Sequence, residues 1–260
     1  MTETLPAPRE RTDTLPLELP ERTLGYHAAA WMMDNLVQPN GPRAGQPFIP
    51  TDRQIEFLAH FYALNHKGGF TYRQGIRRLS KGSGKSPFAA ALCLFELLGP
   101  CRFDGFDRHE PFGVRAKPMS MPLVQIVATS ESQTANTIRM VRAFCQKKGP
   151  LARKYDLEVA KTFIEAPGGG KLQQMTSSAH SMEGGEVSFV VGDELEHWLP
   201  AQGGPAMLET IQQNAAKMGG RFMGTCNAWV PGEQSSAEAI FEAWCDQEDG
   251  LTRGKTKILY

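Results

Sequence analysis

The sequence lacks several features that would assign it to a common protein class. It has no C-x-x-C pair, and its five cysteines are widely spaced, so neither a zinc site nor a disulfide framework is indicated. Scattered thiols in a reducing cytosol are the simpler expectation. No apolar run reaches the roughly 18 residues that a membrane span needs, and the first residues lack a signal-peptide pattern. The 28 basic residues balance the 28 acidic ones, so net charge gives no support for a nucleic-acid partner.

The chain is long enough for one large domain or two small ones. It has 260 residues, of which 41% are hydrophobic. Residues 1–22 are rich in Pro, Thr, Glu and Arg and are predicted to form a flexible arm. Along residues 23–260, strand-like and helix-like patterns alternate. This alternation predicts one α/β domain with a mostly parallel central sheet that is flanked by helices on both faces.

A glycine-rich turn at residues 80–86 follows a predicted strand. It precedes a helix that is predicted over residues 88–98. It ends in Gly-Lys-Ser, which directs backbone N–H groups at a phosphate and adds the ammonium of Lys85 and the hydroxyl of Ser86. The full phosphate-loop pattern has glycine where this chain has Leu79, so a chance match is the alternative. The residues expected to bind ATP here are Ser80, Lys81, Gly82, Ser83, Gly84, Lys85 and Ser86.

A second motif follows an apolar strand predicted over residues 187–191. The strand ends in Gly192-Asp193-Glu194, and neighbouring side chains at a strand end point in different directions. Asp193 can therefore share a Mg²⁺ ion with Ser86, while Glu194 orients or activates the attacking water. An ordinary surface turn is the alternative, but the upstream phosphate loop favours the functional interpretation.

Two further polar segments complete the set. Thr225 and Asn227 follow a strand predicted over residues 221–225, where they can sense a γ-phosphate; a simple turn is the alternative. Gln54 has an amide that both donates and accepts, as the adenine edge requires. Its place three residues after Thr51 also predicts a capping box, which is the alternative role.

The order and spacing of these motifs resemble the ATPase region of the large terminase subunit of tailed double-stranded DNA bacteriophages. That family has an upstream Gln motif, matched by Gln54, and a phosphate loop without the first glycine, matched by Leu79. It also has a Ser-x-x-Gln-Ala-type helix, matched by residues 129–135, and a Ser-Ala-x-Ser segment, matched by residues 178–185. The resemblance covers residues 45–260.

The resemblance implies a P-loop NTPase of the RecA/ASCE type that uses ATP and Mg²⁺ to drive viral DNA through the portal into the procapsid. The implied partners are double-stranded DNA, contacted through its backbone, the portal protein and the small terminase subunit, in the host cytoplasm. The implied assembly is a homo-oligomeric ring on the portal, with a monomer as the alternative in isolation. The residues placed in catalysis are Glu194, Lys85, Thr225 and Asn227, with Ser86 and Asp193 on Mg²⁺.

Some features depart from the family or leave alternatives open. Lys81 stands where the family usually has Arg, which keeps the charge but loses the bidentate phosphate geometry. The family continues into an RNase H-like nuclease domain, which these 260 residues lack, so no nuclease activity is expected of them.

Arg139 and Arg142 are candidates for an arginine that acts on a neighbouring subunit, or belong to a solvated helix face. Basic residues in 99–122 and 147–154 are candidate DNA contacts, or ordinary solvated charge.

Two other functions remain open at this point. A helicase-like or other DNA-remodelling ATPase would share the phosphate loop and the carboxylate pair. A nucleotide-binding assembly module without catalysis would keep the loop and lack turnover.

Overall fold

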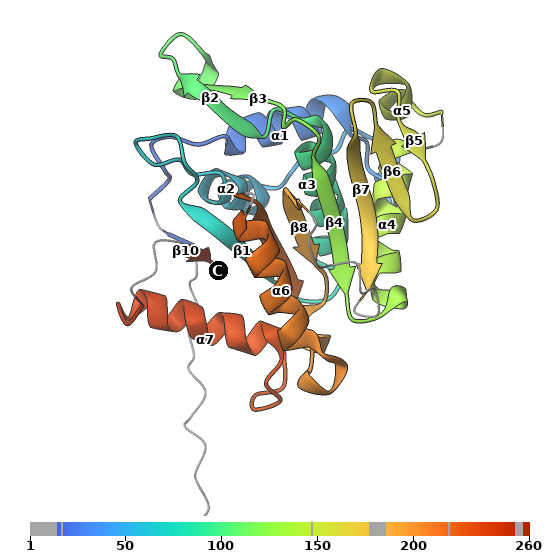
Figure 1. The fold of residues 1–260 in the computed structure, drawn as a ribbon. Helices are drawn as coiled ribbons and strands as arrows, with labels where there is room; N and C mark the ends of the chain where they lie inside the picture. Colours follow the sequence, from blue (N-terminus) through green and yellow to red (C-terminus); the bar gives the residue numbers. More distant parts are fainter. Residues whose placement is uncertain (1–14, 17, 147, 177–185, 218, 253–256) are drawn as a thin grey trace, which may run out of the picture.

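An eight-stranded sheet forms the centre of the protein in the computed structural model, which describes residues 15–260 except 17, 147, 177–185, 218 and 253–256 (Figure 1). Most of the arm predicted over 1–22 therefore lies outside the described residues. The strand order is β10-β1-β9-β8-β4-β7-β6-β5. All neighbours from β10 to β7 run parallel, and β6 and β5 extend the sheet antiparallel. The strands are β1 (Tyr72–Arg78), β4 (Leu123–Ala128), β5 (Glu158–Val159), β6 (Phe163–Ala166), β7 (Gly170–Thr176), β8 (Phe189–Gly192), β9 (Arg221–Cys226) and β10 (Lys257–Leu259).

Helices cover both faces of this sheet, as the sequence predicted. One face carries α1 (Gly25–Asn35), α2 (Asp52–Phe61), α3 (Lys85–Leu98), α4 (Glu131–Cys145) and α5 (Pro150–Lys154). The other carries α6 (Gly204–Lys217) and α7 (Ser236–Glu248), together with the short 3₁₀ helices η3 (Leu195–His197) and η4 (Pro200–Gln202).

The apolar core is divided by the sheet into two clusters. On β8, Val191 packs with α2, α3 and α4, whereas its neighbour Val190 packs with α6 and α7. On β9, Met223 and Phe222 divide in the same way. Successive side chains of a strand point to opposite faces, so a strand that is apolar at every position must be buried on both sides. This is why the continuous apolar runs form the central parallel strands.

Residues 102–117, within the segment 99–122, form an antiparallel hairpin. Its strands are β2 (Arg102–Phe106) and β3 (Val114–Lys117), joined through the 3₁₀ turn η1 (Pro111–Gly113). It extends from the molecule at the sheet edge where α3 ends (Figure 1). Two basic side chains of the hairpin are ion-paired, Lys117 with Asp104 at 3.0 Å and Arg115 with Asp107 at 3.4 Å. The hairpin therefore offers less unpaired positive charge to DNA than the sequence suggested.

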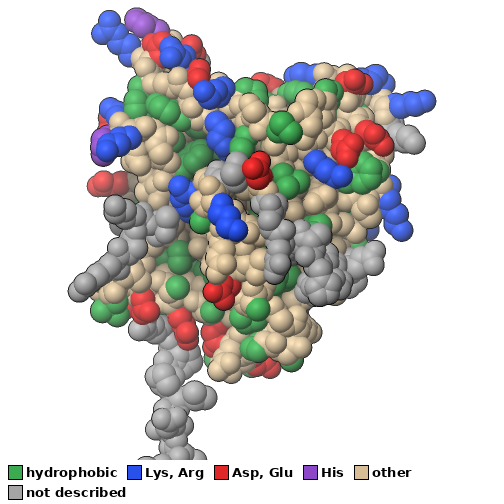
Figure 2. All heavy atoms as spheres, in the orientation of Figure 1, with side chains coloured by type: hydrophobic (Ala, Val, Ile, Leu, Met, Phe, Trp, Pro, Cys, Tyr) green, Lys and Arg blue, Asp and Glu red, His purple; other side chains and the backbone are tan. Residues whose placement is uncertain are grey.

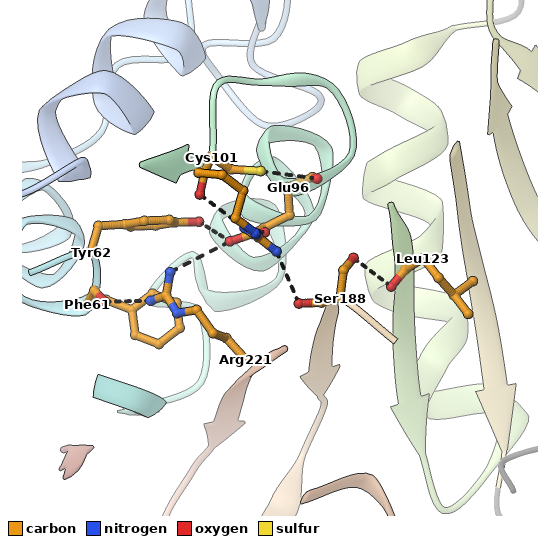
Figure 3. Close-up of polar contacts among 8 residues, drawn as sticks. Phe61, Tyr62, Glu96, Cys101, Leu123, Ser188 and Arg221 are labelled. Atoms are coloured by element: carbon orange, nitrogen blue, oxygen red, sulfur yellow. Dashed lines mark hydrogen bonds and ion pairs between the residues drawn. The ribbon is translucent and has the colours of Figure 1, made fainter. Parts of the chain in front are cut away.

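A buried group of charged residues ties α3 to the sheet near the base of this hairpin (Figure 3). Glu96 and Arg221 are both buried, with Oε1 and Nη1 3.8 Å apart. Glu96 also accepts hydrogen bonds from the Tyr62 hydroxyl at 2.6 Å and from Arg102 Nη1 at 2.7 Å. Arg102 in turn donates to the Ser188 carbonyl, directly before β8, at 3.3 Å. One carboxylate thus anchors the last turn of α3 and the first residues of β8 and β9 at the same edge.

All five cysteines are buried free thiols, which agrees with the expectation for this chain. Within the described ranges, no helix is long and apolar enough to cross a bilayer. Charge is unevenly distributed over the surface despite the zero net charge. In the face that Figure 2 draws, Lys and Arg side chains lie in the upper half, across its width, with Asp and Glu side chains among them.

Candidate nucleotide site

The predicted phosphate loop connects β1 to α3 at the carboxyl edge of the sheet. Gly82 and Gly84 have φ angles of 83° and 81°, in the left-handed region that favours glycine. A Cβ at either position would meet nothing within 4 Å, so the loop borders open space. Helix α3 begins at Lys85, and among the described residues no side chain caps its N-terminus. The first N–H groups of α3 and its dipole therefore favour an anion at this loop.

Lys85 lies folded onto the loop. Its ammonium donates to the carbonyl oxygens of Leu79 at 2.6 Å and Ser80 at 2.9 Å, and to Oδ1 of Asn227 at 2.7 Å. An ammonium has three hydrogens, so these acceptors use all of them. The loop lysine and the polar segment after β9 are therefore in direct contact.

Strand order explains this contact. β9 lies between β1 and β8, with Thr225 paired to Arg77 of β1 and Gly224 paired to Gly192 of β8. The N–H of Leu79, at the start of the loop, also donates to the Cys226 carbonyl at 3.0 Å. The phosphate loop after β1, the residues after β9 and the residues after β8 therefore meet at one edge of the sheet, because the carboxyl ends of parallel strands lie at the same edge.

Asp193 follows β8 and is held by two hydroxyl groups. Thr225 Oγ1 donates to its Oδ1 at 2.6 Å, and Thr137 Oγ1 of α4 donates to its Oδ2 at 2.5 Å. Only 3% of Asp193 is exposed. This burial raises the pKa of Asp193, and the two threonine hydrogen bonds oppose the rise because they stabilise the ionised form. The carboxylate is thus fixed in one orientation.

The oxygen donors at this edge suit Mg²⁺. In the described part of the chain, no three His, Cys, Asp or Glu side chains gather into a metal site by themselves. Mg²⁺, however, is usually held by one or two protein oxygens together with substrate phosphates. Asp193, with its fixed carboxylate, and Ser86, in the first turn of α3, supply such oxygens. The residues therefore fit a magnesium ion that arrives with a nucleotide.

Glu194 has an unusual backbone conformation. Its φ and ψ are 55° and 53°, in the left-handed region, and its N–H donates to Thr225 Oγ1 at 3.3 Å. Left-handed backbone at a residue other than glycine is strained and is often found at functional sites. Burial, and then the charges of Asp193 and Glu196, raise the pKa of Glu194, while the charges of His197 and then Lys81 lower it. Lys81 is therefore close enough to influence the candidate catalytic base.

Comparison with known proteins identifies the architecture. No protein-family model matches the chain. It is 36% identical over 255 residues to the Gene 13 protein of Mycobacterium phage D29, a match that covers 89% of this chain and 42% of the relative. It is 37% identical over 253 residues to the Gene 13 protein of Mycobacterium phage L5, covering 87% and 42%. The chain thus spans less than half the length of these curated relatives.

Among solved structures, the HK97 bacteriophage large terminase matches with a TM-score of 0.65, over 87% of this chain and 42% of that one. The chain has the fold of a phage large terminase. The resemblance predicted from the motifs is thereby confirmed. Because the sequence identity to the HK97 protein is 13%, this structural likeness establishes the fold alone.

Within the terminase fold, Gln54 takes the local role that its spacing allowed. Its Oε1 accepts from the Thr51 N–H at 2.9 Å, and its own N–H donates to Thr51 Oγ1 at 3.4 Å. The capping box is therefore present. The Nε2 group of Gln54 takes no part in that box, and its contact with an adenine base stays a prediction.

The remaining family features are placed only in part. Arg139 and Arg142 are exposed on α4, and their action on a neighbouring subunit stays a prediction. The segment that matches the Ser-Ala-x-Ser pattern, 178–185, lies outside the described residues. Its contribution to the site stays a prediction.

Three residues of the candidate site were not predicted from the sequence. Thr137 reaches Asp193 from a buried position on α4, and Trp198 Nε1 donates to the Asp193 carbonyl at 3.0 Å. Glu196 accepts a hydrogen bond from Asn227 Nδ2. The only sequence signal was for Glu196, a third acidic residue two positions after the carboxylate pair. Nothing in the local sequence distinguishes Thr137 from other helix threonines.

Proposed function

We propose that this chain is the ATPase motor region of a phage large terminase, which hydrolyses ATP to drive double-stranded viral DNA through the portal into the procapsid. The observation that carries the proposal is the contact between the phosphate-loop ammonium of Lys85 and Asn227, beside the Thr225–Asp193 hydrogen bond. The large-terminase fold supports the same reading.

Each polar group has a defined role in this proposal. The nucleotide phosphates lie on residues 82–86, with Lys85 beside the β- and γ-oxygens. Ser86 and Asp193 hold Mg²⁺, which when bound offsets the negative charge of the phosphates. Glu194 positions water in line with the γ-phosphorus and accepts its proton, a role that its raised pKa favours.

The residues after β8 and β9 act through position. Thr225 holds both the Asp193 carboxylate and the Glu194 backbone. It therefore fixes the position of the base, Glu194, relative to the metal ligand, Asp193. In this proposal Asn227 reports loss of the γ-phosphate, and its contact with Lys85 supports that role. Gln54 contacts the adenine base through the half of its amide that the capping box leaves unused.

The proposed partners follow from the motor function. DNA is contacted through its phosphates, because a packaging motor must accept any sequence. The Lys and Arg side chains in the upper half of the face drawn in Figure 2 are the candidates for such contact. The portal, the small terminase subunit and further copies of the chain in a ring complete the assembly, in the host cytoplasm. The exposed Arg139 or Arg142 would act on the neighbouring site.

ATP turnover of the Glu194→Gln variant tests the proposal. With portal and DNA present, we expect turnover to fall by roughly 10²–10⁴-fold, the usual contribution of a general base, while nucleotide binding persists. Glu209→Gln, on the exposed surface of α6, is the matched control and should retain full turnover. Unchanged turnover of Glu194→Gln would contradict the assigned role. Tight ATP binding by the wild-type chain without hydrolysis would instead favour a non-catalytic module.

A further inference from the structure

Glu196 is a buried carboxylate with only part of its hydrogen-bonding capacity used. Its side chain lies in η3, two residues after Glu194, and the residue is 7% exposed. Oε1 accepts from Asn227 Nδ2, whereas the buried Oε2 has no hydrogen-bond partner among the described residues. Burial of a half-satisfied carboxylate is costly, and such groups in a native protein usually have a function.

The hydrogen bond from Asn227 to Glu196 determines which end of the amide faces Lys85. An amide has one acceptor oxygen and one donor NH₂ group. Because the carboxylate can only accept, it attracts the NH₂ group of Asn227, and Oδ1 is turned toward the Lys85 ammonium. With the amide reversed, the NH₂ group would face an ammonium, and no hydrogen bond could form.

Lys85 must leave one of its three acceptors when it binds phosphate. Two of them, Leu79 O and Ser80 O, belong to the backbone of the loop itself. Asn227 Oδ1 is the one acceptor on a side chain, and it comes from a different strand. A phosphate oxygen can therefore replace it without any change in the loop backbone.

We infer that Glu196 is a positioning residue that controls, through Asn227, how strongly Lys85 is held away from nucleotide phosphates. The inference rests on the proposed nucleotide site and adds a residue to it. Phosphate binding and the Asn227–Lys85 hydrogen bond compete for the same ammonium hydrogen. By linkage, a change that weakens this hydrogen bond raises nucleotide affinity by the same factor.

Equilibrium binding of a fluorescent ADP to Glu196→Ala and Glu196→Gln distinguishes positioning from charge. Both variants remove the negative charge, but only glutamine keeps an acceptor for the Asn227 NH₂ group. We expect Glu196→Ala to lower Kd by about 3–10-fold and Glu196→Gln to stay within about twofold of wild type. An equal fall in both variants would assign the effect to lost charge and overturn the inference. Unchanged Kd in Glu196→Ala would overturn it as well.

Asn227→Ala provides a second test, at a side chain that is only half-buried. It removes the hold on Lys85 directly, so Kd should fall by a similar factor. The Glu196→Ala/Asn227→Ala double variant should then bind no more tightly than Asn227→Ala alone. Further tightening in the double variant would show that Glu196 acts independently of Asn227.

Lys85→Ala separates failure of this inference from failure of the proposed function. If wild type binds the fluorescent ADP and Lys85→Ala does not, the nucleotide site stands, and the Glu196 variants test the inference alone. If wild type and Lys85→Ala both fail to bind, the proposed nucleotide site is wrong, and the inference falls with it.

Discussion

Thr225 donates its hydroxyl hydrogen to Asp193 over 2.6 Å, across the ends of two neighbouring strands. Its oxygen also accepts the Glu194 N–H at 3.3 Å. The Thr225 hydroxyl thus joins β9 to both Asp193 and Glu194, the two carboxylate residues after β8. Thr137 completes the arrangement from the opposite side of Asp193. The candidate metal ligand is therefore held by residues that come from two different layers of the fold.

Removal of either hydroxyl should weaken the response to Mg²⁺. In Thr137→Val and Thr225→Val, the Asp193 carboxylate loses a donor that fixes its direction, and loss of such a supporting group typically costs about 10–100-fold in metal affinity or activity. A Mg²⁺ titration of ATP turnover measures the effect. Thr210→Val on α6, where the exposed hydroxyl donates only to its own helix, is the control. An unshifted Mg²⁺ midpoint in both site variants would count against the assignment of Asp193.

Asp193→Asn should stabilise the fold at neutral pH while impairing turnover. Burial raises the pKa of Asp193. A group with a raised folded-state pKa contributes stability below its unfolded-state pKa and loses it as the pH rises through the folded-state value. Asparagine carries no charge to bury at any pH. At neutral pH the Tm of the variant should therefore exceed that of wild type, by roughly 2–4 °C for each ~1 kcal/mol relieved.

The pH dependence of this difference provides the check. It should disappear in acid, where the wild-type carboxyl is protonated in both states. Asp34→Asn, at an exposed position on α1, should show no such pH-dependent gain. A Tm of Asp193→Asn below that of wild type at neutral pH would mean that the carboxylate stabilises the fold.

Lys81→Ala should move the acid limb of the pH–rate profile to higher pH. The positive charge of Lys81 lowers the pKa of Glu194, so its removal raises that pKa, and the base is protonated at a higher pH. Lys81→Arg keeps the charge and should leave the limb in place. Arg108→Ala, an exposed position on the hairpin, removes a charge without this effect. The measurement is kcat over the acid range at saturating ATP. Identical acid limbs in wild type and Lys81→Ala would show that Lys81 does not influence the pKa of Glu194.

Glu96→Ala should be strongly destabilising. It leaves the buried Arg221 and the largely buried Arg102 without their shared carboxylate, and loss of one partner of a buried ion pair costs about 3–5 kcal/mol. Urea unfolding at neutral pH gives the free energy. Asp104→Ala, which breaks the exposed pair with Lys117, is the control and should leave the free energy of unfolding close to that of wild type. Similar losses of unfolding free energy in the two variants would show that the buried cluster stabilises the fold no more than the exposed pair does.

Features that depend on a few neighbouring residues could be predicted from the sequence. The glycines at positions 82 and 84 signalled a tight turn, where both have left-handed φ angles, and Thr51 with Gln54 signalled the capping box that is present. The apolar run before Asp193 signalled a strand, and that strand is buried at every position. In each case the hydrogen bonds or the φ angles involve residues within a few positions of one another, so local chemistry is sufficient.

The contacts that make these motifs a site were decided by tertiary structure. Lys85 and Asn227 are 142 positions apart in the sequence and meet because β9 is inserted between β1 and β8. Thr137 reaches Asp193 because α4 packs on that face, and the ion pair of Lys117 with Asp104 depends on hairpin register. Strand order and helix packing follow from burying both faces of the sheet at once, a property of the whole chain that no short segment encodes. The sequence by itself determined which chemical groups the protein has, and the packed sheet determined which of them touch.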